Sequence, residues 1–192
     1  MVRLLRWFLL SMVAAAVPCT AWTYSRPGVA ASCAVALGVA WLGPFLFARL
    51  GMRLSSGLWL LWLLPFALAW GLGEGMGLFA RLPWWDHVAH AAAGAMVFAL
   101  VRSWTAPRLR AGRVSLELAC VLAALAVGAA WEIGEFACDS WLGSATQAGN
   151  TDTMLDLVFD ACGAAAAALA LAASDLAGRV RFRLLPARER GA

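Results

Sequence analysis

The sequence contains no lysine, only two histidines and few charged residues of any kind. Charged residues make up 14% of the 192 positions, whereas a soluble domain carries about 25%. Hydrophobic residues make up 63%, compared with about 45–50% in soluble domains. A water-soluble fold could not bury this excess of apolar side chains, but a lipid bilayer accepts it. The composition therefore excludes an ordinary soluble domain and predicts an integral membrane protein.

The signatures of several enzyme classes are also missing. The lipid-phosphatase pattern cannot be formed without lysine and with two histidines. The segment with Asp156 and Asp160 lacks the Asp-Gly and Ala-Arg pieces of the CDP-alcohol phosphotransferase pattern. No Gly-x-Ser-x-Gly elbow, P-loop or nucleotide-binding glycine motif occurs. The five cysteines form no Cys-x-x-Cys pair, and most lie in apolar segments, where a free cysteine behaves as a small hydrophobe. The net charge of +4 comes from arginines between apolar segments, so we expect no nucleic-acid partner.

Six apolar segments account for most of the chain. They are Trp7–Trp22, Val29–Ala48, Leu58–Leu72, Asp86–Val101, Leu116–Trp141 and Met154–Ala173. Several approach the roughly 20 residues that a helix needs to cross the hydrocarbon core. We therefore expect a single integral membrane domain over residues 1–192, an all-α polytopic bundle of about six transmembrane helices. Residues 1–21 could pass as a signal peptide, but no clean small-x-small cleavage site follows, so we expect a retained first helix.

Arginine is distributed asymmetrically along this arrangement. Of the 15 arginines, 13 lie in the N-terminus, the second and fourth loops and the C-terminal tail, whereas only Arg26 and Arg81 lie in the odd-numbered loops. Arginine-rich connections stay in the cytoplasm, so we expect both termini inside (N-in/C-in). The first two helices, within residues 1–57, carry no site motif, residues 58–174 carry the polar residues described below, and residues 175–192 form a basic cytoplasmic tail.

The third apolar segment contains Pro65 and then glycine at every second position from Gly71 to Gly77. Proline and glycine are poor helix formers, so we expect this helix to loosen and its Gly/Glu end to curl at the membrane edge. Irregular backbone at that depth is tolerated only where it is buried in protein or lines water. Glu74 lies in this end and could join the polar residues of the outer half or be hydrated.

Eight of the 11 acidic residues and both histidines fall in the outer half of the predicted bundle. The informative ones form stripes on three helices: Asp86 with His90; Glu132, Glu135 and Asp139; and Asp152, Asp156 and Asp160. Spacings of three, four, seven and eight place each set on one helix face. Small residues (Gly94, Gly128 and Gly163) lie nearby, where helices could approach closely. We therefore expect the three stripes to face one another or water rather than lipid.

The charges of these stripes do not balance, because Arg81 and two largely neutral histidines are the nearby groups that could offset them. Clustered carboxylates must then hold protons, share a cation or stay hydrated. Carboxylate and imidazole together suit Zn, Mn or Fe, and chains of such groups also serve as proton relays. The candidate ligands of a divalent metal ion are Asp86, His90, Glu132, Glu135, Asp156 and Asp160. Cys138 lies at the same level and is either a further ligand or an ordinary cysteine at the outer edge.

Four segments carry a family resemblance. They are Trp84-Trp85-Asp86-His87-Val88-Ala89-His90 followed by Gly94, then Trp131-Glu132-Ile133-Gly134-Glu135-Phe136, then residues 147–156 (QAGNTDTMLD), and finally Asp160-Ala161-Cys162-Gly163-Ala164. Together they resemble the YjdF-like family of small bacterial inner-membrane proteins over roughly residues 58–170. They resemble more loosely the VanZ-like (teicoplanin-resistance) proteins, in which Asn often stands at the position of Asp160. The resemblance implies a multi-pass protein of the bacterial inner membrane whose polar residues work together, and the VanZ-like part implies a role in the cell envelope.

Three functions remain open from the sequence. The first is a metal-assisted hydrolase or transferase acting on a lipid-linked or other small-molecule envelope substrate, with His90, Glu132 and Asp156 as metal ligands or acid/base groups. In it, His87, Gln147, Asn150 and Asp152 would face the substrate. The second is a small proton- or cation-coupled transporter, which requires a polar path to the cytoplasm. The third is a structural or partner-binding membrane protein whose acids specify helix packing. The sequence leaves the oligomeric state open.

Overall fold

A computed structural model describes residues 2–23, 27–109, 112–143 and 146–184, and every regular element in those ranges is helical. Five helical segments are long and apolar enough to cross a membrane: Val2–Ala21, Gly28–Arg49, Ser56–Glu74, Arg113–Trp141 and Asn150–Leu176. The predicted all-α membrane bundle is thus confirmed at the level of its class. The fourth predicted segment corresponds to α5 (Trp85–Thr105), which has 21 residues but is not among these five.

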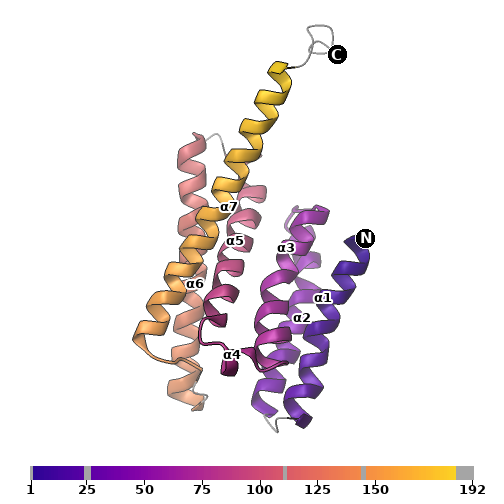
Figure 1. Cartoon of the computed structure of the whole chain (residues 1–192), viewed down its shortest axis with the longest axis vertical. Coiled ribbons are helices and arrows are strands. Elements are labelled where there is room, and N and C mark those ends of the chain that lie inside the picture. Colours follow the sequence, from indigo (N-terminus) through magenta and orange to yellow (C-terminus); the bar gives the residue numbers. More distant parts are fainter. Residues whose placement is uncertain (1, 24–26, 110–111, 144–145, 185–192) are drawn as a thin grey trace.

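The long helices form two groups of three that pack side by side (Figure 1). One group contains α1 (Val2–Pro18), α2 (Pro27–Arg49) and α3 (Ser56–Phe66), and the other contains α5, α6 (Arg113–Leu142) and α7 (Asn150–Leu184). Successive long helices run in opposite directions, so α1 begins and α7 finishes at the same end of the bundle. We call this the arginine end, because Arg49 at the end of α2, Arg102 near the end of α5 and Arg113 at the start of α6 lie there. The other end, where α5 and α7 begin, carries the short helix α4 (Leu78–Arg81), and we call it the α4 end.

Each group has its own apolar core. The buried residues of the first core are Val13, Ala36, Ala40, Trp62, Leu63, Phe66 and Leu100. Leu100 is the one contributed by α5, and the partly buried Met96 of the same helix packs against this core. The second core fills the centre of the α5–α7 group, and we call it the apolar layer. Its buried residues are Val97, Phe98, Leu116, Cys120, Ala124 and Ala164. Helix α5 supplies residues to both cores and therefore joins the two groups.

The third predicted segment changes its helical geometry where the sequence predicts loosening. The α-helix α3 ends at Phe66, one residue after Pro65, and continues as the π-helix η2 (Ala67–Glu74). The Gly75 N–H donates to Trp70 O at 3.0 Å, a bond that spans five residues rather than four. Gly77 then adopts a left-handed conformation (φ 70°) that turns the chain into α4. A second π-helix, η1 (Cys19–Thr23), follows Pro18 at the end of α1.

Glycines bring the helices of the second group into close contact. A Cβ on Gly94 of α5 would collide with the backbone of Asp160 on α7, and one on Gly163 of α7 would collide with the backbone of Ala91. On α6, a Cβ on Gly128 would collide with the carboxylate of Asp160. Small residues allow membrane helices to approach this closely. The acidic face of α7 is therefore held directly against the histidines of α5.

The arginine end of the second group is held by ion pairs. Arg102 of α5 donates through Nε to Glu117 of α6, at 3.0 and 3.1 Å from its two carboxylate oxygens. Arg113 Nη1 of α6 lies 3.0 Å from Asp175 Oδ2 of α7. These pairs link all three helices, and the apolar layer separates them from the polar groups at the α4 end. Residues 175–184 of the predicted basic tail continue α7 as a helix that extends beyond its neighbours (Figure 1).

Candidate functional site

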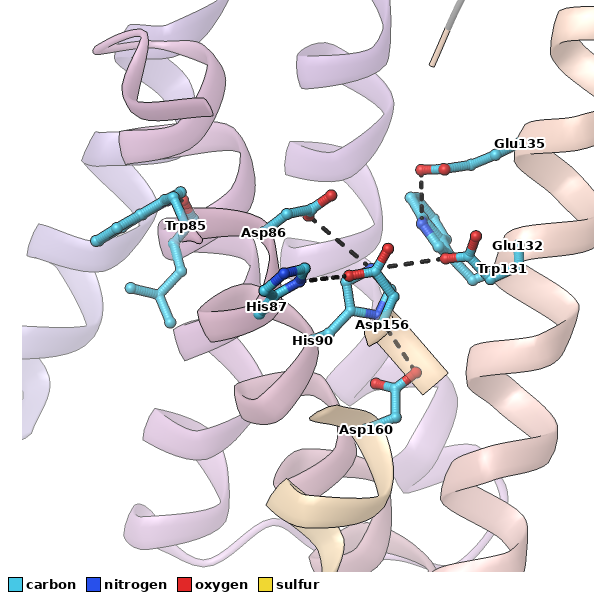
Figure 2. A network of polar contacts seen from close by, with 10 residues as sticks. Trp85, Asp86, His87, His90, Trp131, Glu132, Glu135, Asp156 and Asp160 are labelled. Carbon is cyan, nitrogen blue, oxygen red and sulfur yellow. Dashed lines mark hydrogen bonds and ion pairs between the residues drawn. The ribbon is translucent and has the colours of Figure 1, made fainter. Parts of the chain in front are cut away.

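His90 occupies the centre of a polar cluster at the α4 end. It lies one turn into α5, which begins at Trp85, and only 9% of its surface is exposed. Its Nδ1 lies 3.2 Å from Asp160 Oδ2 on α7. On the other side of the ring, Nε2 lies 3.9 Å from Asp86 Oδ1 and 3.7 Å from Glu132 Oε1 of α6. The imidazole is thus bracketed by carboxylates from all three helices (Figure 2).

His87 makes the second contact between α5 and α7. Its Nδ1 lies 3.0 Å from Asp156 Oδ1, and its ring is stacked on Phe159 with centroids 4.7 Å apart and planes inclined by 6°. Asp156 is 2% exposed, and the half-buried His87 gives this buried carboxyl group a polar partner. The two acids of α7, one turn apart, therefore meet two different histidines of α5 (Figure 2).

Three of the predicted ligands come together in a way that could hold a metal ion. One ligand atom each from Asp86, His90 and Asp156 can be chosen so that all lie within 4.8 Å of one another. Glu132 adjoins this group through the contact of its Oε1 with His90 Nε2, and that oxygen is buried without a hydrogen-bond partner. A buried acceptor left without a donor is costly, and a cation would satisfy it. Carboxylate oxygens and an imidazole nitrogen suit Zn, Mn or Fe.

Exposure shows on which side the cluster is open. The side chain of Asp86 is 40% exposed, whereas those of His90, Glu132, Asp156 and Asp160 are between 3% and 11% exposed. Beneath the cluster, the apolar layer fills the space between the same three helices. The cluster is therefore open past Asp86 at the α4 end and closed toward the arginine end.

Other predicted residues lie outside this group. Glu135 accepts from Trp131 Nε1 at 2.9 Å rather than contacting His90, and Asp139 accepts from the backbone N–H groups of Thr146 (2.7 Å) and Gln147 (2.9 Å). The remaining residues are Asp152, which is half-buried, Asn150 and Cys138, which are exposed, and Glu74, which is half-buried at the end of η2. None of these four belongs to the group of potential ligands found among the described residues.

Three further residues support the cluster and were not predicted as site residues, although two of them, Trp131 and Thr153, lie in the segments that carry the resemblance. Trp131 and Phe159 make the contacts given above. Thr153 accepts from Gln147 Nε2 at 2.9 Å, and its side chain lies within hydrogen-bonding reach of the Glu132 carboxyl. Trp131 could have been noticed, because it precedes Glu135 by one helical turn. Thr153 and Phe159 carry no such signal, since neither residue type is unusual in a membrane helix.

Comparison with known proteins identifies the family of this chain. No curated protein and no solved structure matches the chain. Residues 4–175 match the family described as predicted membrane protein (DUF2238), and this match includes every residue of the polar cluster. Because it spans most of the 192 residues, the chain belongs to this family of predicted membrane proteins.

Proposed function

We propose that this protein is a metal-assisted hydrolase or transferase that acts on a lipid-linked substrate of the cell envelope. The observation that carries the proposal is the buried Oε1 of Glu132, which lacks a hydrogen-bond donor and faces His90 Nε2 beside Asp86. Asp86, His90, Glu132 and Asp156 are the proposed ligands. A divalent ion bound there would supply a Lewis acid and an activated water. The looser VanZ-like part of the resemblance supports an envelope role.

We further propose that all six long helices span the bacterial inner membrane, with α5 as the sixth. The polar residues of α5 face α6 and α7, so they do not have to enter lipid. The described arginines lie at the arginine end, except Arg81 of α4, and this favours the N-in/C-in orientation with a cytoplasmic basic tail at residues 175–192. Four arginines of the count lie outside the described residues: Arg26, Arg110, Arg188 and Arg190. The whole chain then forms one membrane domain with its polar cluster toward the outer surface.

The side chains around the cluster have distinct proposed roles. His90 and Asp156 hold the ion, and Glu132 serves as ligand or as the acid/base group, because its free oxygen faces the same space. His87 fixes Asp156 through the 3.0 Å contact at the edge of the site. Three residues at the start of α7 and just before it form the proposed substrate-facing lip: Gln147, Asn150 and Asp152.

The apolar layer favours an enzyme over a transporter. Transport requires a polar path through the bundle, but the described residues between the cluster and Arg102 include the buried Val97 and Phe98 of α5. An enzyme at the outer surface needs access from one side only. The cluster of this protein is open past Asp86 at the α4 end and closed by the apolar layer toward the arginine end.

The proposal is tested by the metal content of gently purified protein, measured by mass spectrometry. We expect about one or two ions per chain in the wild type and none in the Glu132→Gln/Asp156→Asn variant. The matched control is Glu117→Gln/Asp175→Asn, which neutralises two carboxylates at the arginine end and should keep the metal. Wild-type protein without stoichiometric metal would contradict the proposal and favour a structural role for the acids.

A further inference from the structure

We infer that Asp160 is not a ligand of the proposed ion but the residue that positions His90 for binding it. This inference rests on the proposed function and concerns the same site. It changes the sequence-based expectation, in which Asp160 is one of six candidate ligands. The two acids of α7 then have different tasks, Asp156 at the ion and Asp160 behind the imidazole.

The two ring nitrogens of His90 have different neighbours, and this difference supports the inference. His90 Nδ1 lies 3.2 Å from Asp160 Oδ2. An ionised carboxylate only accepts, so in the proposed arrangement Nδ1 carries the proton and donates it to Asp160. In the neutral imidazole that binds a metal, a proton on Nδ1 leaves the lone pair on Nε2, which faces Asp86 Oδ1 and Glu132 Oε1. A histidine that binds a metal through one nitrogen commonly donates its other N–H to a carboxylate, which fixes the tautomer and the ring orientation. Asp160 occupies that place in this cluster.

The packing of α7 leaves the Asp160 carboxylate little freedom. The residue is 2% exposed and lies between a glycine of α5 and a glycine of α6. Its backbone occupies the space where Gly94 would have a side chain, and its carboxylate occupies the corresponding space at Gly128. A Cβ on Gly128 would lie 2.9 Å from Asp160 Cγ and even closer to Oδ2. The carboxylate is therefore held by shape as well as by its bond to His90.

The contact between Gly128 and the Asp160 carboxylate provides a way to move the carboxylate without changing any polar group. Gly128→Ala would displace Asp160 Oδ2 and, through it, the ring of His90. Gly134 lies on the same helix, and a Cβ there would meet nothing within 4 Å. The Gly134→Ala variant is thus a matched control for the effect of alanine on α6 itself.

The experiment is a zinc titration of detergent-purified protein by competition with a chelator. We expect Asp160→Ala to bind zinc about 10- to 100-fold more weakly than wild type, as is typical for the loss of such a partner. Asp160→Asn keeps an oxygen that can accept from Nδ1–H, so it should bind with an affinity between the two. Gly128→Ala should be weakened in the same direction as Asp160→Ala, and Gly134→Ala should bind like wild type.

A spectroscopic measurement separates positioning from general support of the fold. The chain has two histidines, so ¹⁵N-histidine labelling gives two imidazole ring systems. With zinc bound, the His90 ring should show a protonated Nδ1 and a metal-bound Nε2, and Asp160→Ala should lose this single pattern. Should Asp160→Ala fail to fold, Asp160→Asn and Gly128→Ala decide the outcome.

The possible failures are distinguishable. Wild-type protein that binds no zinc, manganese or iron would overturn both the proposed function and this inference. Zinc binding in the wild type together with unchanged affinity in folded Asp160→Asn and Gly128→Ala would overturn the inference alone. A loss of all binding in Asp160→Asn, with Gly128→Ala unaffected, would show instead that Asp160 is itself a ligand.

Discussion

Replacing Glu132 by glutamine tests whether this carboxylate serves a ligand or the fold. The change keeps the shape of a side chain that is only 5% exposed and removes its charge. A buried polar atom without a hydrogen-bond partner destabilises a protein by about 1–3 kcal/mol, and more if the group is charged. Glu132 Oε1 is such an atom. We therefore expect metal-free Glu132→Gln protein to be at least as stable as metal-free wild type.

Metal should reverse this order. An ion present at about 100 times its dissociation constant stabilises the folded state by about 2.7 kcal/mol. For a chain of this size, about 1 kcal/mol corresponds to roughly 2–4 °C in Tm, so the wild type should gain about 5–11 °C. Glu132→Gln should gain much less, because it has lost one of the charged ligands. The two proteins should thus exchange their order of stability when metal is added.

The assay is thermal unfolding in detergent micelles, with a chelator and then with zinc, manganese or iron(II). Glu135→Gln is the control, since Glu135 bonds to Trp131 and lies outside the proposed ligands, and it should keep the wild-type response to metal. A Glu132→Gln variant that is clearly less stable than wild type in the chelator would refute the reasoning. It would show that the carboxylate stabilises helix packing without any ion.

Three further outcomes are expected. Gly163→Ala should lower stability by about 1–3 kcal/mol or more, because its Cβ meets backbone across the helix interface, whereas Gly134→Ala should be neutral or stabilising; thermal unfolding measures both. Glu117→Gln should cost about 1 kcal/mol by weakening the partly buried pair with Arg102, and metal content should stay unchanged; a loss of metal would show that the two ends are coupled. A variant that retains Cys138 as its single cysteine should react with a membrane-impermeant maleimide added outside intact cells; labelling only after lysis would reverse the proposed orientation.

Helical periodicity predicted the faces of the site helices but not how those faces meet. The i, i+4 spacing of Asp86 and His90 correctly placed them on one face of α5, where Asp86 Oδ1 lies 3.9 Å from His90 Nε2. The spacing of Glu132 and Glu135 likewise placed both on one side of α6. It could not show that Glu132 meets His90 of α5 whereas Glu135 bonds to Trp131 within α6, because contacts between helices depend on which neighbour packs against each turn.

The membrane class was predictable from composition, whereas the place of α5 between the two groups of helices was not. Its polar first turns make it less apolar than the other long helices, yet α5 contributes to both cores. A helix surrounded by other helices does not need a fully apolar surface, and hydropathy alone cannot reveal that surrounding. The sequence predicted that the helix would loosen after Pro65, but it could not distinguish an unwound segment from the continuous π-helix η2.

The apolar layer also determines which electrical environment the cluster senses. Moving one elementary charge across the whole membrane potential changes its energy by about 2.3 kcal/mol per 100 mV. In the proposed orientation, the layer around Phe98 and Ala164 separates the cluster from the cytoplasm. We therefore expect most of that voltage to fall across this layer and little of it between the cluster and the outer water. An ion entering past Asp86 would cross only a small part of the field. Its occupancy would then follow the metal concentration at the outer face of that membrane and would be nearly independent of whether the membrane is energised.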